Sequence, residues 1–206
     1  MFDRKCKIIF INHGSTIYTE QNRLYDQDDY PPVNEKGKKE IEKIAQWLKT
    51  SNQNIDLIYT SSALRAIQSA RIIAKNLKVD FEIMDNLFER RAGIWGGMTF
   101  NQIKKKHPDL FEEYQKNPCM FCQEGGESTS VLNRRISECL NHIVKDSIHK
   151  SILIITHTGV IQSAISTALG IPPENQERIY IPTGSATQIN YYEGWCSLVY
   201  SAYTQL

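Results

Sequence analysis

The chain has 206 residues, with 41% hydrophobic and 23% charged side chains, which excludes a disordered or fibrous protein and fits a single domain over residues 1–206. The 24 Lys and Arg residues nearly balance the 23 Asp and Glu residues, for a formal charge of +1, so we expect no binding to nucleic acid. No apolar run approaches the roughly 20 residues of a membrane helix, and the first residues lack the apolar core of a signal peptide. We therefore expect a cytoplasmic protein that does not bind membranes.

Apolar runs and helical periodicities alternate along the chain. The expected strands are residues 7–11, 56–60, 79–84, 151–156, 186–192 and 195–203. The expected helices are residues 37–48, 63–77, two short segments on either side of Pro108, 127–144 and 158–169, with Ser61 and Ser62 as N-caps of the second. This order predicts a three-layer α/β/α sandwich with a mostly parallel central sheet.

Five cysteines are scattered along the chain, an odd number that suits reduced thiols. Cys119 and Cys122 have the spacing of half a zinc or redox motif, but the sequence contains no second half to complete four ligands. We expect partly buried thiols in a loop here, and no metal.

Polar residues that carry chemistry follow three of the expected strands. Asn12 and His13 end the first strand, Arg65 lies one turn into the helix after the second, and His157 ends the fourth. Ligands of parallel sheets bind beyond the carboxyl ends of the strands, where helix N-termini also present free N–H groups. Two histidines and an arginine in one such cleft suit an anion, most plausibly a phosphoryl group.

Each of these residues also has a structural interpretation. A single histidine at a strand end is more often a hydrogen-bonded structural residue, Arg65 alone fits a helix surface, and Glu89 alone fits a solvated loop. Taken together they favour a reactive site, because a carboxyl group beside a cationic cleft can donate a proton to a departing alkoxide.

Five ordered motifs resemble the histidine phosphatase (phosphoglycerate mutase-like) superfamily. The matching segments are NHGST at 12–16 (RHGxT in the family), SSALRAIQSA at 61–70 (SSxLxRAxQTA), LFE with GIWGG at 87–97 (LxE…GxWEG), GGES at 125–128 (GGES) and THTGVI at 156–161 (SHGGVI). The resemblance covers almost the whole chain and implies a phosphoglycerate mutase-like fold in the phosphatase branch, with residues 97–128 as a variable segment covering the substrate.

The resemblance also implies roles for four residues. His13 would be the nucleophile that forms a phosphohistidine, and Glu89 would protonate the leaving oxygen. Arg65 would clamp the phosphoryl oxygens, and His157 would contact them, preferably as a charged imidazolium donor. Histidine and arginine already supply the positive charge, so no metal or cofactor is required.

Further residues are expected to bind the substrate. They are Asn12, Thr16, Thr19, Arg23, Arg90, Ser185 and Ala186, the last two through backbone N–H groups next to Gly184. Thr19 stands where the family has an asparagine.

Asn12 departs from the family, which has arginine at this position. Loss of one charge-assisted contact should cost about 1.5–3 kcal/mol if nothing replaces it. Arg23, Arg90 or Arg91 could restore the charge, and the sequence does not decide among them.

Three functions remain open from the sequence. A phosphomonoester hydrolase is favoured. A catalytically weak or silent phospho-ligand-binding protein is supported by Asn12 alone. A cofactor-dependent phosphoglycerate mutase is disfavoured, because Ala92 and Phe100 stand where mutases place a tyrosine and a lysine. The substrate is a small phosphomonoester of undetermined identity, and exposed strand edges make a homodimer reasonable.

Overall fold

Six strands form one central sheet in the computed structural model, which describes residues 4–26, 28, 30–51 and 53–205. The strands are β1 (Arg4–Asn12), β2 (Leu57–Thr60), β3 (Phe81–Ile83), β4 (Ser151–Thr156), β5 (Ala186–Tyr192) and β6 (Cys196–Tyr203). Their order is β3-β2-β4-β1-β5-β6. The first four run parallel, and β5 and β6 are antiparallel to their neighbours. The predicted mostly parallel α/β sandwich is confirmed.

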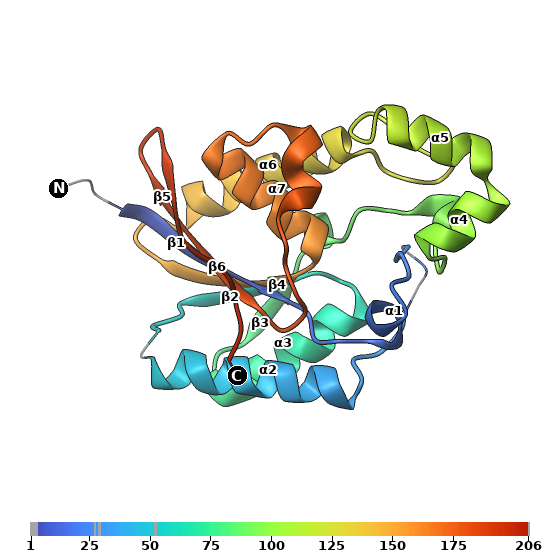
Figure 1. Cartoon of the computed structure of the whole chain (residues 1–206). Helices are drawn as coiled ribbons and strands as arrows, with labels where there is room; N and C mark the ends of the chain where they lie inside the picture. The colour runs from blue at the N-terminus through green and yellow to red at the C-terminus, as the bar shows by residue number, and fades with distance from the viewer. Residues whose placement is uncertain (1–3, 27, 29, 52, 206) are drawn as a thin grey trace.

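Helices cover both faces of this sheet (Figure 1). They are α1 (Ile17–Glu20), α2 (Glu35–Thr50), α3 (Leu64–Leu77), α4 (Phe100–Lys106), α5 (Pro108–Lys116), α6 (Thr129–Asp146) and α7 (Thr158–Leu169), with 3₁₀ turns η1 (Asp85–Leu87), η2 (Gly93–Trp95) and η3 (Pro173–Arg178). Helices α2 and α3 lie on one face, and α6 and α7 lie on the other. None of the helices within the described residues is long and apolar enough to cross a membrane.

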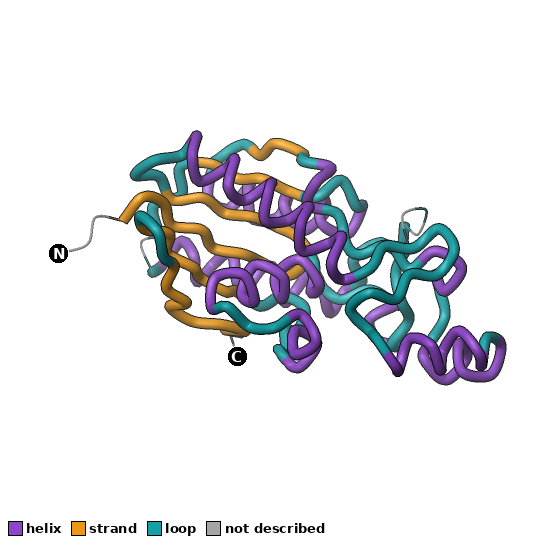
Figure 2. The backbone as a smooth tube through the Cα atoms, turned by 90° about the horizontal axis from the view of Figure 1, so that it is seen from above, coloured by secondary structure: helices purple, strands orange, loops and turns teal. Residues whose placement is uncertain are grey.

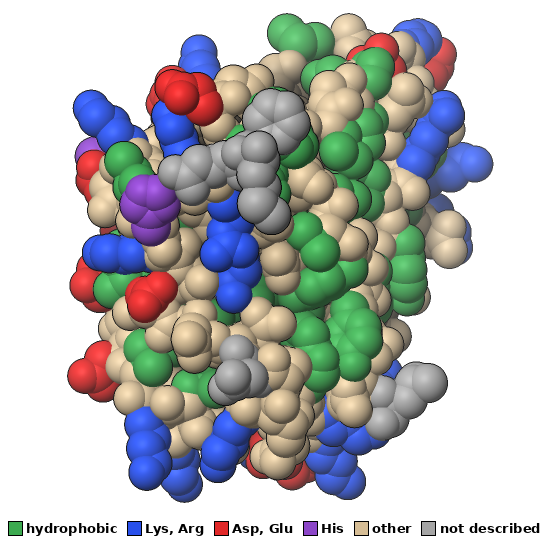
Figure 3. Space-filling view, turned by 90° about the vertical axis from the view of Figure 1, so that its left-hand side faces the viewer, with side chains coloured by type: hydrophobic (Ala, Val, Ile, Leu, Met, Phe, Trp, Pro, Cys, Tyr) green, Lys and Arg blue, Asp and Glu red, His purple; other side chains and the backbone are tan. Residues whose placement is uncertain are grey.

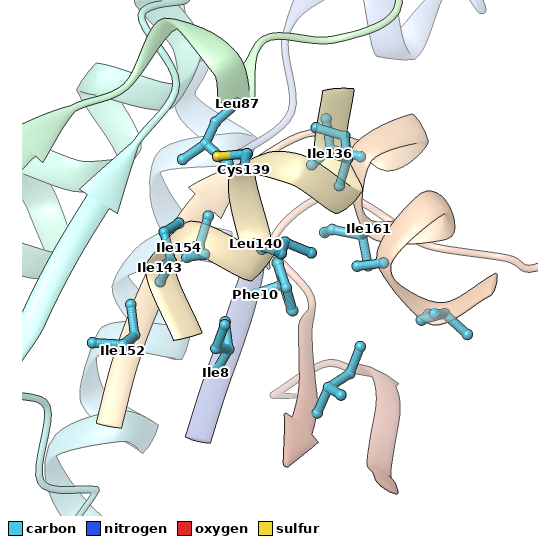
Figure 4. Close-up of a cluster of buried hydrophobic side chains, with 14 of the residues drawn as sticks. Ile8, Phe10, Leu87, Ile136, Cys139, Leu140, Ile143, Ile152, Ile154 and Ile161 are labelled. Carbon is cyan, nitrogen blue, oxygen red and sulfur yellow. The ribbon is translucent and has the colours of Figure 1, made fainter. Parts of the chain in front are cut away.

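Alternate side chains of the central strands enter two separate cores, because successive residues of a strand point to opposite faces. On β1, Ile8 and Phe10 pack against α6 and α7, and Figure 4 shows this cluster. Ile9 and Ile11 pack against α2 and α3 on the other face. Because β1 and β4 are covered on both faces, their near-continuous apolar runs are what a buried parallel sheet requires.

Helix capping explains where some elements begin. The Asn34 side chain accepts a hydrogen bond from the Gly37 backbone, so α2 begins two residues before the expected start. Ser128 is the N-cap of α6, which begins at Thr129, two residues after the expected start. The predicted N-caps Ser61 and Ser62 are wrong, because Ala63 occupies the N-cap of α3 and no side chain caps it. The Ser61 hydroxyl instead bonds a histidine described below.

Loops gather at the end of the sheet where the parallel strands finish (Figure 2). Helices α4 and α5 extend beyond this end. The opposite end of the molecule presents a mixed surface, on which hydrophobic side chains gather in a band with Lys and Arg side chains around it (Figure 3). The carboxyl ends of the strands are thus the part of the fold where helices and loops surround a site.

Candidate active site

A cavity of about 1100 Å³ opens beyond the carboxyl ends of the strands. His13 and Glu89 line it, together with Thr19, Arg23 and Arg90. The same cavity continues to an aromatic wall formed by Trp95, Phe100, Tyr114 and Phe121. Of the residues predicted at the strand ends, His13 lines this space, which is large enough for a small molecule, whereas Asn12, Arg65 and His157 are not among its lining residues.

Hydrogen bonds fix the tautomer of the buried His13 ring. The Arg65 Nε donates to His13 Nε2 over 3.2 Å, and arginine has no acceptor, so Nε2 carries a lone pair. The proton lies on Nδ1, which donates to the carbonyl of Gly14 over 2.9 Å. The backbone of β1 and the Gly14 carbonyl hold the ring with a nucleophilic nitrogen facing Arg65.

The same guanidinium fixes His157. Arg65 Nη2 donates to His157 Nδ1 over 3.1 Å, so the His157 proton lies on Nε2, which donates to the Ser61 hydroxyl over 2.8 Å. The two imidazoles lie edge to face, with centroids 5.2 Å apart. One arginine therefore bonds the lone pairs of both histidines.

Both histidines are neutral near pH 7. Burial, and next to it the charge of Arg65, lowers the pKa of His13 to about 3. Burial, Arg65 and His13 lower the pKa of His157 well below its usual value. The neutral state suits His13 as a nucleophile. The expectation that His157 is an imidazolium is wrong, because desolvation and a neighbouring arginine both oppose a second buried charge.

Tyr25 covers Arg65, which is fully buried. The guanidinium carbon lies 3.7 Å from the centroid of the Tyr25 ring, a cation–π contact. The Tyr25 hydroxyl bonds Thr16 Oγ1 over 2.5 Å, and its ring lies edge-on to His13. Tyr25 was not predicted from the sequence, because nothing in the spacing of a loop residue shows which side chain it covers.

Asn12 is almost fully buried and is not among the residues that line the cavity. Its Nδ2 donates to Thr158 Oγ1 over 3.0 Å and lies 3.3 Å and 3.1 Å from the carbonyl oxygens of Ile181 and Pro182. These contacts tie the end of β1 to the start of α7 and to the segment before β5. In this structure the hydrogen bonds of Asn12 hold the backbone of residues 181 and 182 in place, which is a structural role.

Glu89 follows η1 and lines the cavity. Its carboxylate accepts hydrogen bonds from the backbone N–H of Arg90 over 2.8 Å and of Gly159 over 3.1 Å. A Cβ at position 159 would collide with the carboxylate, so the glycine after His157 leaves room for the acid. This places a carboxyl group and a histidine lone pair on the wall of one cavity.

A bidentate ion pair holds the segment before Glu89. Arg135 on α6 bonds both carboxylate oxygens of the buried Glu127, over 2.9 Å and 2.6 Å. Its Nη1 also donates to the carbonyl oxygens of Asn86 and Phe88, each over 2.9 Å. The Glu127 backbone N–H bonds the Arg91 carbonyl. The residues on both sides of Glu89 are therefore attached to the start of α6.

Three further predicted residues lie on the cavity wall. Thr19 bonds the backbone of Thr16 at the start of α1. Arg23 donates to the Gly97 carbonyl. Arg90 donates to Thr129 Oγ1 and pairs with Glu177 at 3.5 Å.

Four other candidates lie away from the wall. Thr16 is buried as the N-cap of α1. Ser185 and Ala186 are buried at the start of β5, beneath Thr183 and Gly184, which do line the cavity. Arg91 lines a separate cavity beside α6. Of the three arginines considered as substitutes at the site, Arg23 and Arg90 are thus the ones that border it.

Residues 8–204 match the histidine phosphatase superfamily (branch 1). The chain belongs to this superfamily, as a phosphatase. It is 29% identical over 167 residues to phosphoserine phosphatase 1 of Hydrogenobacter thermophilus, an alignment that covers 80% of this chain and 77% of the relative. It also spans about half the length of a 25% identical bifunctional protein of Mycobacterium tuberculosis.

Solved structures share the fold. YhfR of Bacillus stearothermophilus superimposes with a TM-score of 0.87 at 23% identity, and a putative alpha-ribazole-5'-P phosphatase of Escherichia coli does so with 0.87 at 18% identity. Each superposition covers 96% of both chains. At these identities the likeness establishes the three-layer architecture.

Proposed function

We propose that this protein hydrolyses small phosphomonoesters through a phosphohistidine on His13. The observation that carries the proposal is the His13 ring, which is held neutral with its Nε2 lone pair toward Arg65, on the wall of a cavity that also contains the Glu89 carboxyl group. Relatives named as phosphatases of phosphoserine and of alpha-ribazole phosphate support a small phosphorylated substrate.

In the first half-reaction, His13 Nε2 attacks phosphorus and the bond from phosphorus to the ester oxygen breaks. The departing oxygen takes a proton from Glu89, so the alcohol leaves neutral. Arg65 must transfer its hydrogen bonds from the two histidines to the phosphoryl oxygens, where its charge stabilises the transition state. The Tyr25 ring must move aside for this contact, because it covers the guanidinium.

In the second half-reaction, water attacks phosphorus and the bond from phosphorus to nitrogen breaks. The Glu89 carboxylate takes the proton from that water, and inorganic phosphate leaves. The net reaction converts ester and water into alcohol and phosphate. His157 is neutral and bonded to Ser61 through Nε2, and it keeps Arg65 oriented. Its ring must reorient before a ring nitrogen can contact the phosphoryl group.

A single domain over residues 1–206 would perform this reaction, with residues 97–128 covering the substrate. Hydrolysis without a metal, a cytoplasmic location and pairing of two copies through a strand edge are predictions of the same account.

A panel of phosphomonoesters with phosphate release as the readout tests the proposal. At least one ester should be hydrolysed well above the background of the His13→Ala variant. Equal release by the two proteins for every ester would exclude the proposed enzyme.

A silent phospho-ligand-binding protein is the second candidate, and Asn12 supports it. The Asn12 contacts favour the active enzyme instead, since they give the asparagine a structural role that does not depend on substrate. The arginines that border the cavity, Arg23 and Arg90, would then supply the charge.

The Asn12→Arg variant separates the two candidates. For the active enzyme, Asn12→Arg should leave kcat/KM unchanged or reduce it. Thr158 and the carbonyls of residues 181 and 182 already fill the buried space around position 12, so the longer arginine side chain cannot remain there. Wild type without turnover, together with ready turnover by Asn12→Arg, would establish the silent binder. Replacement of Arg90 by Gln should reduce kcat/KM more in wild type than in Asn12→Arg if Arg90 is the substitute.

A further inference from the structure

The cavity is much larger than a phosphoryl group, and aromatic rings form part of its wall. Apart from His13 and Glu89, the lining includes the rings of Trp95, Phe100, Tyr114 and Phe121, together with polar side chains such as Gln123 and Gln176. The phosphoryl group would occupy the histidine end, so the rest of the space faces whatever the ester oxygen carries.

The aromatic rings form one packed group with an open side. Trp95 stacks on Phe121 at a centroid distance of 5.1 Å and meets Tyr114 edge-on at 5.8 Å. Phe100 stacks on Tyr114 at 6.0 Å and is 41% exposed. Trp95 is buried and anchors the group, whereas Phe100 presents its surface to the cavity. A flat apolar group would extend this packing in the offset and edge-on arrangements that aromatic rings prefer.

A carboxylate already lies next to the rings. Arg90 pairs with Glu177, and the Tyr114 hydroxyl donates to the same carboxylate over 2.9 Å. Arg23 donates to a backbone carbonyl, which is neutral. An anionic group placed beside Tyr114 would lose its hydration and compete with Glu177 for Arg90, which is costly.

Helix α2 contributes both basic and acidic residues to the cavity wall. Lys36, Lys39 and Lys43 on α2 line it, but all three are exposed, and Lys36 lies 3.9 Å from Glu40. Exposed and partly neutralised lysines contribute little binding energy. The packed rings therefore decide the chemistry of the leaving group.

We propose that the substrate is a phosphomonoester whose leaving alcohol carries an aromatic or extended apolar group, which binds among Trp95, Phe100, Tyr114 and Phe121. This inference rests on the proposed phosphoryl site at His13, and it adds the specificity of the aromatic part of the cavity.

Phosphonates test the inference without turnover, because their bond from carbon to phosphorus is not hydrolysed. Titration calorimetry on the wild-type chain would compare 2-(1-naphthyl)ethylphosphonate, ethylphosphonate and 3-phosphonopropionate. The naphthyl compound should bind about 10- to 100-fold more tightly than the ethyl compound, through burial of its apolar area and ring stacking. Equal affinities, or tightest binding of the carboxylate compound, would overturn the inference.

Two variants locate the binding group. Phe100→Ala should reduce the ratio of naphthyl to ethyl affinity severalfold, and it should fold because Phe100 is partly exposed. Val199→Ala, which shortens a similarly exposed apolar side chain on β6, should leave the ratio unchanged. A ratio that Phe100→Ala does not alter would contradict binding among the rings.

Hydrolysis of the corresponding phosphate esters separates this inference from the proposed function. The two leaving alcohols have similar acidity, so their kcat/KM ratio reports binding of the group rather than its departure. Tight naphthyl binding without hydrolysis of either ester would refute the proposed enzyme and support the aromatic subsite. Equal hydrolysis of both esters would support the enzyme and refute the subsite.

Discussion

The two ends of the cavity are built in different ways. At the phosphoryl end, Arg65 bonds a histidine 52 residues away and another 92 residues away in the sequence, and all three side chains are buried. At the aromatic end the rings come from one stretch, residues 95–121, and several of them are partly exposed. The phosphoryl end is held by directed hydrogen bonds, and the aromatic end is held by packing.

This difference separates chemistry from specificity. Hydrogen bonds from one guanidinium set both histidine tautomers, so a change there should alter the reaction itself. Packing among rings tolerates substitution better, so a change there should alter which ester binds. The following predictions test that division.

The largest effect is expected from Glu89→Gln, which removes the proposed proton donor. Hydrolysis of ethyl phosphate should slow by about 10²- to 10⁴-fold, because a poor leaving group needs the acid. In kcat/KM, which reports only the steps up to phosphorylation of His13, p-nitrophenyl phosphate should lose far less, since its phenolate leaves without a proton. The kcat/KM values of both esters check this, and equal losses would mean that Glu89 is not the donor.

A smaller effect is expected in the dependence of stability on pH. The pKa of His13 is about 3 in the folded protein and near 6.5 when unfolded, and His157 is lowered likewise. Below pH 6.5 the unfolded chain therefore binds more protons than the folded one. As the pH decreases, the free energy of unfolding should fall by up to about 1.4 kcal/mol per pH unit for each histidine. For His13 the loss should continue toward pH 3.

Urea unfolding between pH 7.5 and 4.5 measures this slope. His13→Gln should reduce the slope by about 1.4 kcal/mol per pH unit. The matched His142→Gln variant alters an exposed histidine and should leave the slope close to that of wild type. Identical slopes for wild type and His13→Gln would contradict the neutral buried nucleophile.

The smallest of these effects is expected when the ion pair behind Glu89 is removed. The double variant Glu127→Gln/Arg135→Gln takes out both charges together, since one charge left alone and buried would destabilise the fold. Without Arg135 the carbonyls of residues 86 and 88 lose their hydrogen bonds, and Glu89 should be held less well. This should reduce kcat/KM for ethyl phosphate by about tenfold and for p-nitrophenyl phosphate by less. Arg134→Gln changes an exposed neighbour on α6 and serves as the control. Equal reductions for both esters would indicate a structural role only.

The sequence predicts the phosphoryl end better than the aromatic end. Strand periodicity and polar residues at strand ends were sufficient to predict that His13, Arg65 and His157 lie close together, because the carboxyl ends of parallel strands lie at one edge of the sheet. The uncharged state of His157 was not predictable from the sequence, since it depends on the burial of the ring beside Arg65. Residues 97–128 were predicted to cover the substrate, but Tyr25 and the individual rings of residues 95–121 were not predicted, because contacts made by loops and short helices leave no periodic signal. The orientation of Asn12 likewise depends on carbonyls about 170 residues away in the sequence.

The most direct test is a search for phosphate on His13. In Glu89→Gln supplied with p-nitrophenyl phosphate, phosphorylation needs no acid while hydrolysis of the intermediate lacks its base, so the intermediate should accumulate. A burst of p-nitrophenol equal to the enzyme concentration should accompany a base-stable, acid-labile phosphate that mass spectrometry locates on His13. The same burst with phosphate on another residue, or with none on His13, would contradict the account.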